Sequence, residues 1–204
     1  MVLDRSLRKV KEIVFLPGCR LIAGIVTPMQ VTIIGFIFGL LSPLCLCQQY
    51  YALGMIFWII NRILDGVDGT IARVTNTQSD LGGYVDIVCD FIVYALIPIG
   101  LVYANPSPFS YLIVSLLEAT FFVNAASLMV LSSILEKRAL GSKVQGEMTT
   151  VTMPTGLIEG TETIVFMSLS ILFPSYIDTL HILFGLGVIV NIIYRVYWAS
   201  NNID

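Results

Sequence analysis

Five aspartates lie within residues 65–90, between two long apolar runs of the chain. Asp65 and Asp68 are three residues apart, and Asp86 and Asp90 are four residues apart. Residues at these spacings share one face of a helix, so each pair would project from one side of its segment. If the two segments form antiparallel packed helices, we expect the four carboxylates to converge at one depth.

Four carboxylates in an apolar setting repel one another and are costly to bury without positive charge nearby. Arg62 and Arg73 can balance two of these charges, and a pair of divalent cations can balance the rest. Ligand sets made only of oxygen favour hard ions such as Mg²⁺, Mn²⁺ or Ca²⁺ over zinc. The sequence therefore predicts a divalent metal site built from these four aspartates.

Small residues lie beside the predicted metal site. Gly69 follows Asp68, and Gly82 and Gly83 precede the second aspartate pair. Positions without a side chain let a bulky ligand approach the backbone. Arg73 can bind a phosphate with a forked pair of donors, and Mg²⁺ commonly binds through carboxylates plus substrate phosphates. These residues indicate a metal–pyrophosphate site.

Composition identifies the chain as a polytopic membrane protein. Of its 204 residues, 56% are hydrophobic and only 12% are charged, and a soluble domain of this length cannot hide so much apolar surface. The net charge of −3 provides no basic field for nucleic acid, which excludes that class of partner. Apolar runs and helix breakers delimit six candidate spans, at residues 29–48, 50–68, 84–104, 109–134, 150–173 and 177–199.

The basic residues indicate how these spans are oriented. Lys and Arg occur before the first span and in every second connection, whereas the alternate connections carry none. The positive-inside rule therefore places both termini and the aspartates on the cytoplasmic side. Basic and apolar residues at helical spacing over residues 5–15 are typical of an interfacial helix. We predict an all-α integral membrane bundle that forms one domain over residues 1–204, with an N-terminal interfacial amphipathic helix and linker (1–28) and six transmembrane helices (29–199).

The residues alone are also compatible with two different roles for the aspartates. One is a salt-bridge network between the second and third spans, and the other is an ion-coupled transporter, because intramembrane acids often serve ion relays. Transporters usually place such groups near the midplane and show paired halves, and this sequence shows no repeat. Gly35 and Gly39 in the first span permit close helix approach, within the chain or across a dimer.

The aspartate segment resembles the full signature of the CDP-alcohol phosphotransferase family, also called CDP-alcohol phosphatidyltransferases. The pattern is Asp65-x-x-Asp68-Gly69-x-x-Ala72-Arg73, eight further residues, and Gly82-x-x-x-Asp86-x-x-x-Asp90. The six-span topology and Thr27-Pro28 before the first span are also similar to the family. Residues 61–62, 91–98 and 156–163 resemble a bacterial inner-membrane branch of it.

The resemblance implies an enzyme of phospholipid synthesis that transfers a phosphatidyl group from CDP-diacylglycerol to an alcohol and releases CMP. Two divalent ions, Mg²⁺ or Mn²⁺, would be bound by Asp65, Asp68 and Asp86, with Asp90 near the second ion and acting as the base. The nucleotide pocket would be shaped by Gly69, Ala72, Arg73 and Gly82. Related members are commonly homodimers. A CDP-choline-type enzyme with diacylglycerol as acceptor is the alternative within the family.

The acceptor alcohol is less clearly indicated. Members that use a phosphorylated acceptor often carry a basic residue directly after the last aspartate, where this chain has Phe91. Other residues can supply that charge, and glutamates within a span are functional by default. The candidate acceptor-binding residues are Arg62, Lys143, Glu159, Glu162 and Arg195. The two glutamates alternatively form structural ion pairs with Lys143 or Arg195.

Overall fold

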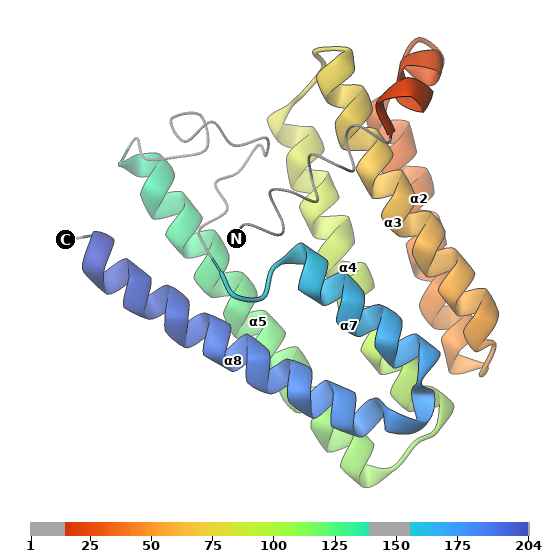
Figure 1. Ribbon diagram of the computed structural model, residues 1–204, viewed down its shortest axis with the longest axis vertical. Coiled ribbons are helices and arrows are strands. Elements are labelled where there is room, and N and C mark those ends of the chain that lie inside the picture. The colour runs from red at the N-terminus through yellow and green to blue at the C-terminus, as the bar shows by residue number, and fades with distance from the viewer. Residues whose placement is uncertain (1–14, 139–155, 204) are drawn as a thin grey trace.

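The computed structural model describes residues 15–138 and 156–203, and within these ranges it contains helices and their connections but no strand (Figure 1). The predicted all-α class is confirmed. The elements in chain order are α2 (Pro28–Cys47), α3 (Tyr51–Val74), α4 (Asp80–Ala104), α5 (Pro108–Lys137), α7 (Gly160–Leu172), the short 3₁₀ helix η1 (Pro174–Tyr176) and α8 (Ile177–Asn202).

A side-chain hydroxyl group caps the N-terminus of three of these helices. Thr27 caps α2, because its Oγ1 accepts from the Gln30 N–H at 3.3 Å while Gln30 Oε1 accepts from the Thr27 N–H at 2.9 Å. Ser79 caps α4 and Ser107 caps α5, each through its hydroxyl oxygen. Such caps satisfy N–H groups that the first turn leaves without partners. Each of these helices therefore begins within a few residues of its predicted span.

The helices form two groups that are joined by α7 (Figure 1). α2 packs against both α3 and α4, and α5 packs against α8. α7 contacts α3, α4 and α8 and so lies between the two groups. α3 and α4 run antiparallel but make few contacts with each other, in contrast to the direct packing predicted from the sequence. The separation of these two helices is set by α2, on which both of them rest.

The small residues of α2 allow this close packing. A Cβ added at Gly39 would lie 2.5 Å from Val93 Cγ2 in α4 and 3.0 Å from Asn61 Nδ2 in α3. A Cβ added at Gly35 would lie 3.1 Å from Leu64 Cβ in α3. The glycine pair in the first span therefore serves packing within the chain, one of the two uses that its spacing permits.

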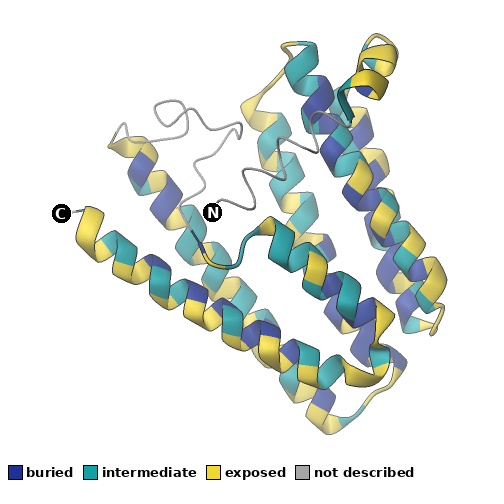
Figure 2. Ribbon diagram, in the orientation of Figure 1, coloured by how far each residue is buried: buried dark blue, intermediate teal, exposed yellow. Residues whose placement is uncertain are grey.

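The apolar core lies on the faces that the helices turn toward one another (Figure 2). Trp58, Ile97, Leu117 and Phe184 belong to one buried cluster that draws on both groups of helices. Apolar side chains are also exposed along the outward faces, for example Ile37 at 51%. An apolar exterior of this extent suits contact with lipid rather than water.

Four helical segments are long and apolar enough to cross a membrane, namely α2, α4, α5 and Pro174–Asn202, which contains η1 and α8. α3 has 24 residues, but Arg62, Asp65 and Asp68 interrupt its apolar stretch. α7 has 13 residues, and at 1.5 Å per residue it is about 20 Å long, less than the roughly 30 Å of a bilayer core. The count of six crossings therefore remains a prediction.

The fifth predicted span, residues 150–173, differs from the helix that the structure contains. α7 begins at Gly160, and residues 156–159 are not helical. Residues 150–155 lie outside the described part of the chain. The helix begins late because Glu159 takes the N-cap position, where its side chain accepts hydrogen bonds instead of continuing a helix upstream.

Of the predicted interfacial helix at residues 5–15, only the last residue is described, and the described helix here falls mainly on the predicted linker. Residues 15–22 are helical. Cys19 is buried there with Val31 of α2 and Ile71 of α3, whereas Leu21 is 80% exposed. Residues 1–14, which carry most of the predicted basic face, lie outside the described residues. The placement of this segment at a membrane surface therefore remains a prediction.

Candidate active site

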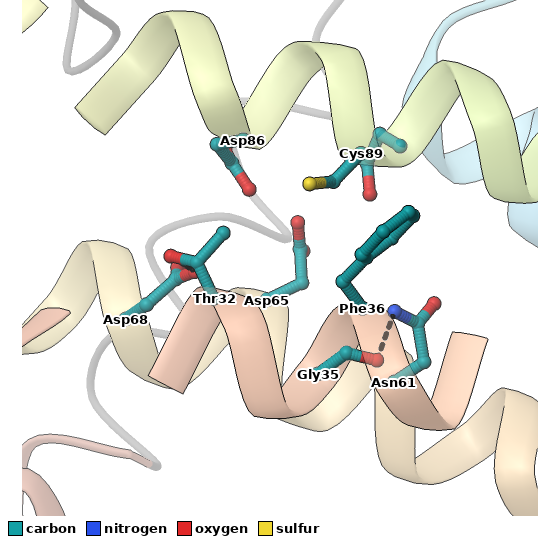
Figure 3. A pocket seen from close by; sticks show the side chains of 9 residues that line it. Thr32, Gly35, Phe36, Asn61, Asp65, Asp68, Asp86 and Cys89 are labelled. Atoms are coloured by element: carbon teal, nitrogen blue, oxygen red, sulfur yellow. Dashed lines mark hydrogen bonds between the residues drawn. The ribbon is translucent and has the colours of Figure 1, made fainter. Parts of the chain in front are cut away.

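α3 and α4 bring three of the predicted metal ligands together (Figure 3). One carboxylate oxygen each from Asp65, Asp86 and Asp90 lies within 4.8 Å of the others. Asp65 projects from α3, and Asp86 projects from α4 toward it across the gap between the two helices. The short connection at residues 75–79 reverses the chain, so α4 returns its aspartates to the depth of those in α3.

Asp68 lies about one turn further along α3 and has partners of its own. Thr32 Oγ1 of α2 donates to Asp68 Oδ2 at 2.6 Å, and the Gly69 N–H donates to Asp68 Oδ1 at 2.5 Å. Asp68 is only 5% exposed. These bonds orient the carboxylate and leave acceptor capacity on both oxygens for a further partner.

A small pocket opens where α2, α3 and α4 meet (Figure 3). The four aspartates share its wall with side chains of all three helices: Thr32, Gly35 and Phe36 of α2, Asn61 of α3 and Cys89 of α4. α2 therefore forms one wall of the pocket and holds apart two helices whose facing carboxylates would repel at closer range.

The clustered ligand atoms suit a hard divalent cation. Oxygens on opposite sides of a bound ion lie about 4.2 Å apart for Mg²⁺ and about 5 Å apart for Ca²⁺. The three carboxylates place their oxygens within 4.8 Å of one another, which is inside this range. The residues present thus fit a divalent metal site of the kind predicted, with Asp68 next to it.

Arg62 pairs with Asp90 through two hydrogen bonds. Nη2 donates to Asp90 Oδ1 at 2.5 Å, and Nη1 donates to Asp90 Oδ2 at 3.1 Å. The Arg62 side chain is 8% exposed and the Asp90 side chain 23%. This forked geometry is the strong form of an ion pair between arginine and a carboxylate. Arg62 therefore supplies a positive charge at the aspartate cluster.

Three further side chains surround the Arg62 guanidinium. Asn61 Oδ1 accepts from Nε at 2.8 Å and from Nη2 at 2.6 Å, and Tyr94 Oη accepts from Nη1 at 2.7 Å. The guanidinium carbon lies 4.8 Å from the Trp58 ring centroid and 5.0 Å from that of Tyr94. Trp58 was not predicted from the sequence, and Asn61 and Tyr94 were noted only as parts of stretches that resemble the family. The helical spacing of the two aromatic residues could have indicated their role. Trp58 precedes Arg62 by four residues, and Tyr94 follows Asp90 by four, so each pair shares one helix face.

The predicted nucleotide-binding residues lie at the end of α3 and the start of α4. Arg73 Nη2 donates to Thr70 Oγ1 at 3.3 Å. A Cβ added at Gly69 would lie 3.3 Å from Arg73 Nη1, so the arginine lies across this glycine. Ala72 is in the same turn of α3, and Gly82 is in the first turn of α4, where its N–H bonds the Ser79 cap.

The predicted acceptor-binding residues do not form one cluster in the structure. Glu159 and Glu162 form a capping box at the start of α7: Glu159 Oε1 accepts from the Gly156 N–H at 3.0 Å, and Glu162 Oε2 accepts from the Glu159 N–H at 3.0 Å. Arg195 of α8 donates to Asn124 of α5. The described residues show no ion pair between either glutamate and Arg195. Lys143 lies outside the described residues.

A second polar cluster fixes the loop before α7. Asn191 of α8 is fully buried, and its Oδ1 accepts from the Leu157 and Ile158 N–H groups at 2.5 Å and 3.2 Å. Its Nδ2 donates to the Ile158 carbonyl at 3.1 Å and to Asn124 Oδ1 at 3.2 Å. Arg195 Nη1 bonds the same Asn124 oxygen at 2.9 Å. The sequence analysis did not identify Asn124 or Asn191.

Comparison with known proteins extends these observations. A family model described as CDP-alcohol phosphatidyltransferase matches residues 20–193. The chain is 32% identical over 160 residues to the inner membrane protein YnjF of Escherichia coli, which covers 78% of this chain and 76% of that protein. It is 28% identical over 203 residues to an archaetidylinositol phosphate synthase of Pyrococcus horikoshii, which covers 100% of this chain and 99% of that protein.

A solved structure has a similar fold. The phosphatidylinositol phosphate synthase PgsA1 of Mycobacterium tuberculosis, with CDP-DAG bound, matches with a TM-score of 0.68 at 17% identity, over 89% of this chain and 90% of that one. At this identity the likeness concerns the fold. The family model, however, spans most of the chain and contains all four signature aspartates. The chain therefore belongs to the CDP-alcohol phosphatidyltransferase family, and it is a membrane transferase of phospholipid synthesis.

Proposed function

We propose that this enzyme transfers a phosphatidyl group from CDP-diacylglycerol to an alcohol acceptor and releases CMP. The observation that carries the proposal is the aspartate cluster, whose oxygens lie within 4.8 Å of one another at the signature positions of the family. A structure of similar fold has CDP-DAG bound, which supports the same donor here.

We assign the metal ions to the aspartates. Asp65, Asp68 and Asp86 would hold two divalent cations, Mg²⁺ or Mn²⁺, with Asp90 beside the second. Bound cations would neutralise the donor pyrophosphate and stabilise the charge that develops on the departing CMP. The carboxylates supply oxygen ligands at a suitable spacing, and the Thr32 hydroxyl and the Gly69 N–H hold Asp68 in orientation for this role.

The proposed reaction requires a group in the site that accepts the proton of the acceptor hydroxyl. The acceptor hydroxyl oxygen forms a bond to the β-phosphorus of the donor, and the bond from that phosphorus to the bridging oxygen breaks. CMP leaves with the bonding electron pair, and the hydroxyl proton passes to an oxygen of Asp90. Asp90 suits this task because its side chain is 23% exposed and lines the pocket.

The nucleotide would lie over the end of α3 and the start of α4. Gly69, Ala72 and Gly82 present little or no side chain there, which leaves room for a bulky cytidine group. Arg73 lies across Gly69 and carries a forked guanidinium, the geometry that binds phosphate oxygens in pairs. The three small residues and Arg73 are all close in sequence to the metal ligands. The pyrophosphate and the nucleotide would therefore be held by neighbouring turns of α3 and α4.

The acceptor remains the open part of the assignment. The residues that the sequence predicts to bind the acceptor are Arg195, Lys143, Glu159, Glu162 and Arg62. Arg195 is 3% exposed, and its Nε has no hydrogen-bond partner, so of this set it has the clearest unused donor for an acceptor group. Glu159 and Glu162 bond backbone N–H groups of the loop and of α7, which assigns them a role in shaping that side of the bundle.

The position of the enzyme in the cell follows from its apolar helices and its basic residues. We place it in the bacterial inner membrane with six crossings, both termini in the cytoplasm and the aspartate site facing the cytoplasm. The Escherichia coli relative is by name an inner membrane protein. We also retain the homodimer as a prediction, which the mass of the detergent-purified protein measured by light scattering would test.

The proposed reaction is tested by CMP release from purified protein in detergent. The assay supplies CDP-diacylglycerol, Mg²⁺ or Mn²⁺, and a panel of alcohols with and without a phosphate group. We expect acceptor-dependent CMP release, reduced by about 10²-fold or more in Asp90→Asn because the proton acceptor is lost. Asp80→Asn is the matched control, since it makes the same chemical change in the exposed first turn of α4.

The same assay separates the alternatives. Release from CDP-choline in the presence of diacylglycerol, with none from CDP-diacylglycerol, would assign the enzyme to the other donor class. Binding of Mn²⁺ without CMP release from either donor would contradict transferase activity and favour an ion-coupled transporter. An Asp80→Asn variant as inactive as Asp90→Asn would show that the assay reports folding and not the site.

A further inference from the structure

We propose that Arg62 is a positioning residue that holds the Asp90 carboxylate in one orientation at the edge of the metal site, and that Arg62 does not bind the acceptor. The inference rests on the proposed function, in which Asp90 accepts the proton of the acceptor hydroxyl. It assigns a role to a buried cation that the reaction itself does not require.

The hydrogen bonds of Arg62 carry this inference. A guanidinium has five N–H donors, and the structure assigns a partner to each of them. Two go to Asn61 Oδ1, two go to the oxygens of Asp90, and one goes to Tyr94 Oη. No donor of Arg62 is left for a phosphate or a hydroxyl of an acceptor. An acceptor could bind Arg62 only by displacing bonds inside the protein.

The partners of Arg62 are themselves held in place. Asn61 Nδ2 donates to the Gly35 carbonyl of α2 at 3.0 Å, as the dashed line in Figure 3 shows. Trp58 Nε1 donates to Ser168 Oγ of α7 at 3.0 Å. The rings of Trp58 and Tyr94 meet edge to face with centroids 6.0 Å apart and lie against the guanidinium. The Gly35 carbonyl of α2 and side chains of α3, α4 and α7 therefore fix the cation, and the cation fixes Asp90.

The geometry leaves Asp90 able to act. Each carboxylate oxygen has two acceptor positions, and the guanidinium takes one on each oxygen. The Tyr94 hydroxyl takes a further position on this carboxylate, and one remains toward the pocket, for a proton or for a single metal contact. Arg62 also places a positive charge beside the cluster, and this charge opposes a cation that would draw Asp90 fully into its coordination shell.

The positioning role of Arg62 can be tested by substitution with lysine, because lysine keeps the positive charge but cannot form the two parallel hydrogen bonds of arginine. In Arg62→Lys we expect kcat to fall by about 10²-fold, since misplacement of a catalytic group by about 1 Å has effects of that size. The acceptor KM should stay within about threefold of the wild-type value, because no acceptor contact is removed. A raised acceptor KM with an unchanged kcat would overturn the inference and make Arg62 an acceptor ligand.

Two further variants separate positioning from loss of folding. Tyr94→Phe keeps the ring and removes one acceptor of the guanidinium, so we expect a smaller fall in kcat, again without a change in KM. Arg62→Met removes the charge, and Mn²⁺ binding measured by titration calorimetry without substrate should tighten by about tenfold because Asp90 becomes free for the ion. Folding of each variant is checked by its thermal unfolding in detergent.

The calorimetric experiment does not depend on the proposed reaction. If the wild-type protein releases no CMP with any donor or alcohol, the proposed function fails, but the effect of Arg62→Met on Mn²⁺ affinity still tests the ion pair. Weaker or unchanged Mn²⁺ binding in a folded Arg62→Met variant would contradict the inference. An active wild-type enzyme with fully active Arg62→Lys and Tyr94→Phe variants would also contradict it, while leaving the proposed function intact.

Discussion

Asp68 lies beside the three clustered aspartates, and a hydroxyl group and a backbone N–H bind its two oxygens. Thr32 Oγ1 reaches it from another helix, 36 residues away in sequence, and the Gly69 N–H reaches it from the next residue. Loss of a side chain that orients a metal ligand typically lowers metal affinity by about 10-fold to 100-fold. At the scale of single residues, the site thus extends beyond its carboxylates to Thr32, Asn61 and Tyr94.

The Thr32 hydroxyl is expected to support metal binding through Asp68. Thr32→Val keeps the shape of the side chain and removes the donor, so we expect Mn²⁺ affinity to fall by about 10-fold to 100-fold. Titration calorimetry of the purified protein measures this change. Thr32→Ser retains the hydroxyl and should bind Mn²⁺ nearly as the wild-type protein does. Equal affinity of the valine and serine variants would show that the Thr32 bond does not tune the site.

At the scale of elements, the connection into α7 explains why its helix is short. Backbone that is not helical is tolerated at membrane depth only where protein groups satisfy it. Asn191 meets this need by bonding two N–H groups and one carbonyl of residues 157–158, and the Glu159 cap begins the helix at Gly160. The buried Asn191 and the half-buried Glu159 therefore replace the turns of helix that the apolar pattern predicts.

The hydrogen bonds between Asn191 and the loop before α7 predict that a substitution of Asn191 lowers the stability of the protein. Asn191→Leu would remove the hydrogen-bond partner of two N–H groups and one carbonyl of the loop, and each lost bond costs about 1 kcal/mol. We expect the free energy of unfolding to fall by about 3 kcal/mol or more, measured by chemical unfolding in detergent. The exposed Asn202 at the end of α8 offers the matched control, and Asn202→Leu should change stability by less than about 0.5 kcal/mol.

The packing of α2 on α4 predicts a second effect on stability. A Cβ added at Gly100 would lie 2.9 Å from the Pro43 carbonyl oxygen and 3.2 Å from Pro43 Cα, both backbone atoms that cannot rotate away. Gly100→Ala should lower the free energy of unfolding by about 1–3 kcal/mol through overpacking. Gly24 has no atom within 4 Å of such a Cβ, so Gly24→Ala is the control. Equal stability of both variants would contradict the close approach of α2 and α4.

At the scale of the whole molecule, α2, α3 and α4 carry the metal site, while α5 and α8 form a second pair that contacts the first group through α7 and directly through α4. The aspartates lie in the halves of α3 and α4 that adjoin the connection between these two helices. The reaction joins a polar nucleotide head to lipid tails. A site near one end of membrane-crossing helices allows both parts of the donor to remain in their preferred surroundings.

The orientation of the molecule is tested by single cysteines in a background without the four native cysteines. Gln78 lies in the connection between α3 and α4, and Ser175 lies between α7 and α8, and both are exposed. A membrane-impermeant thiol reagent should label Ser175→Cys in intact spheroplasts and Gln78→Cys only in inverted vesicles, because the positive-inside rule places these connections on opposite sides. Labelling of both from the same side would contradict an odd number of crossings between them.

Local patterns were sufficient for much of the fold and of the candidate site. The apolar runs located α2, α4, α5 and α8 to within a few residues, and spacings of three and four residues placed the aspartates on common helix faces. The same patterns failed at α7, because Glu159 and Glu162 were interpreted without their hydrogen-bond partners and Asn191 was not identified. A glutamate within an apolar run has the same local pattern whether it binds a substrate or caps a helix.

The sequence by itself determined the class of protein, the helices that carry the four aspartates and, through the signature, the family. Only the tertiary structure decided which distant groups pair with each other. Arg62 bonds Asp90, 28 residues away in sequence. Asn191 bonds backbone groups of a loop that lies 33 to 34 residues away in sequence. The tertiary structure also showed that α2, rather than direct contact of α3 with α4, sets the width of the site. The physical reason is that such contacts depend on the rotation and register of packed helices, which follow from the fit of all side chains together and not from spacing along one segment.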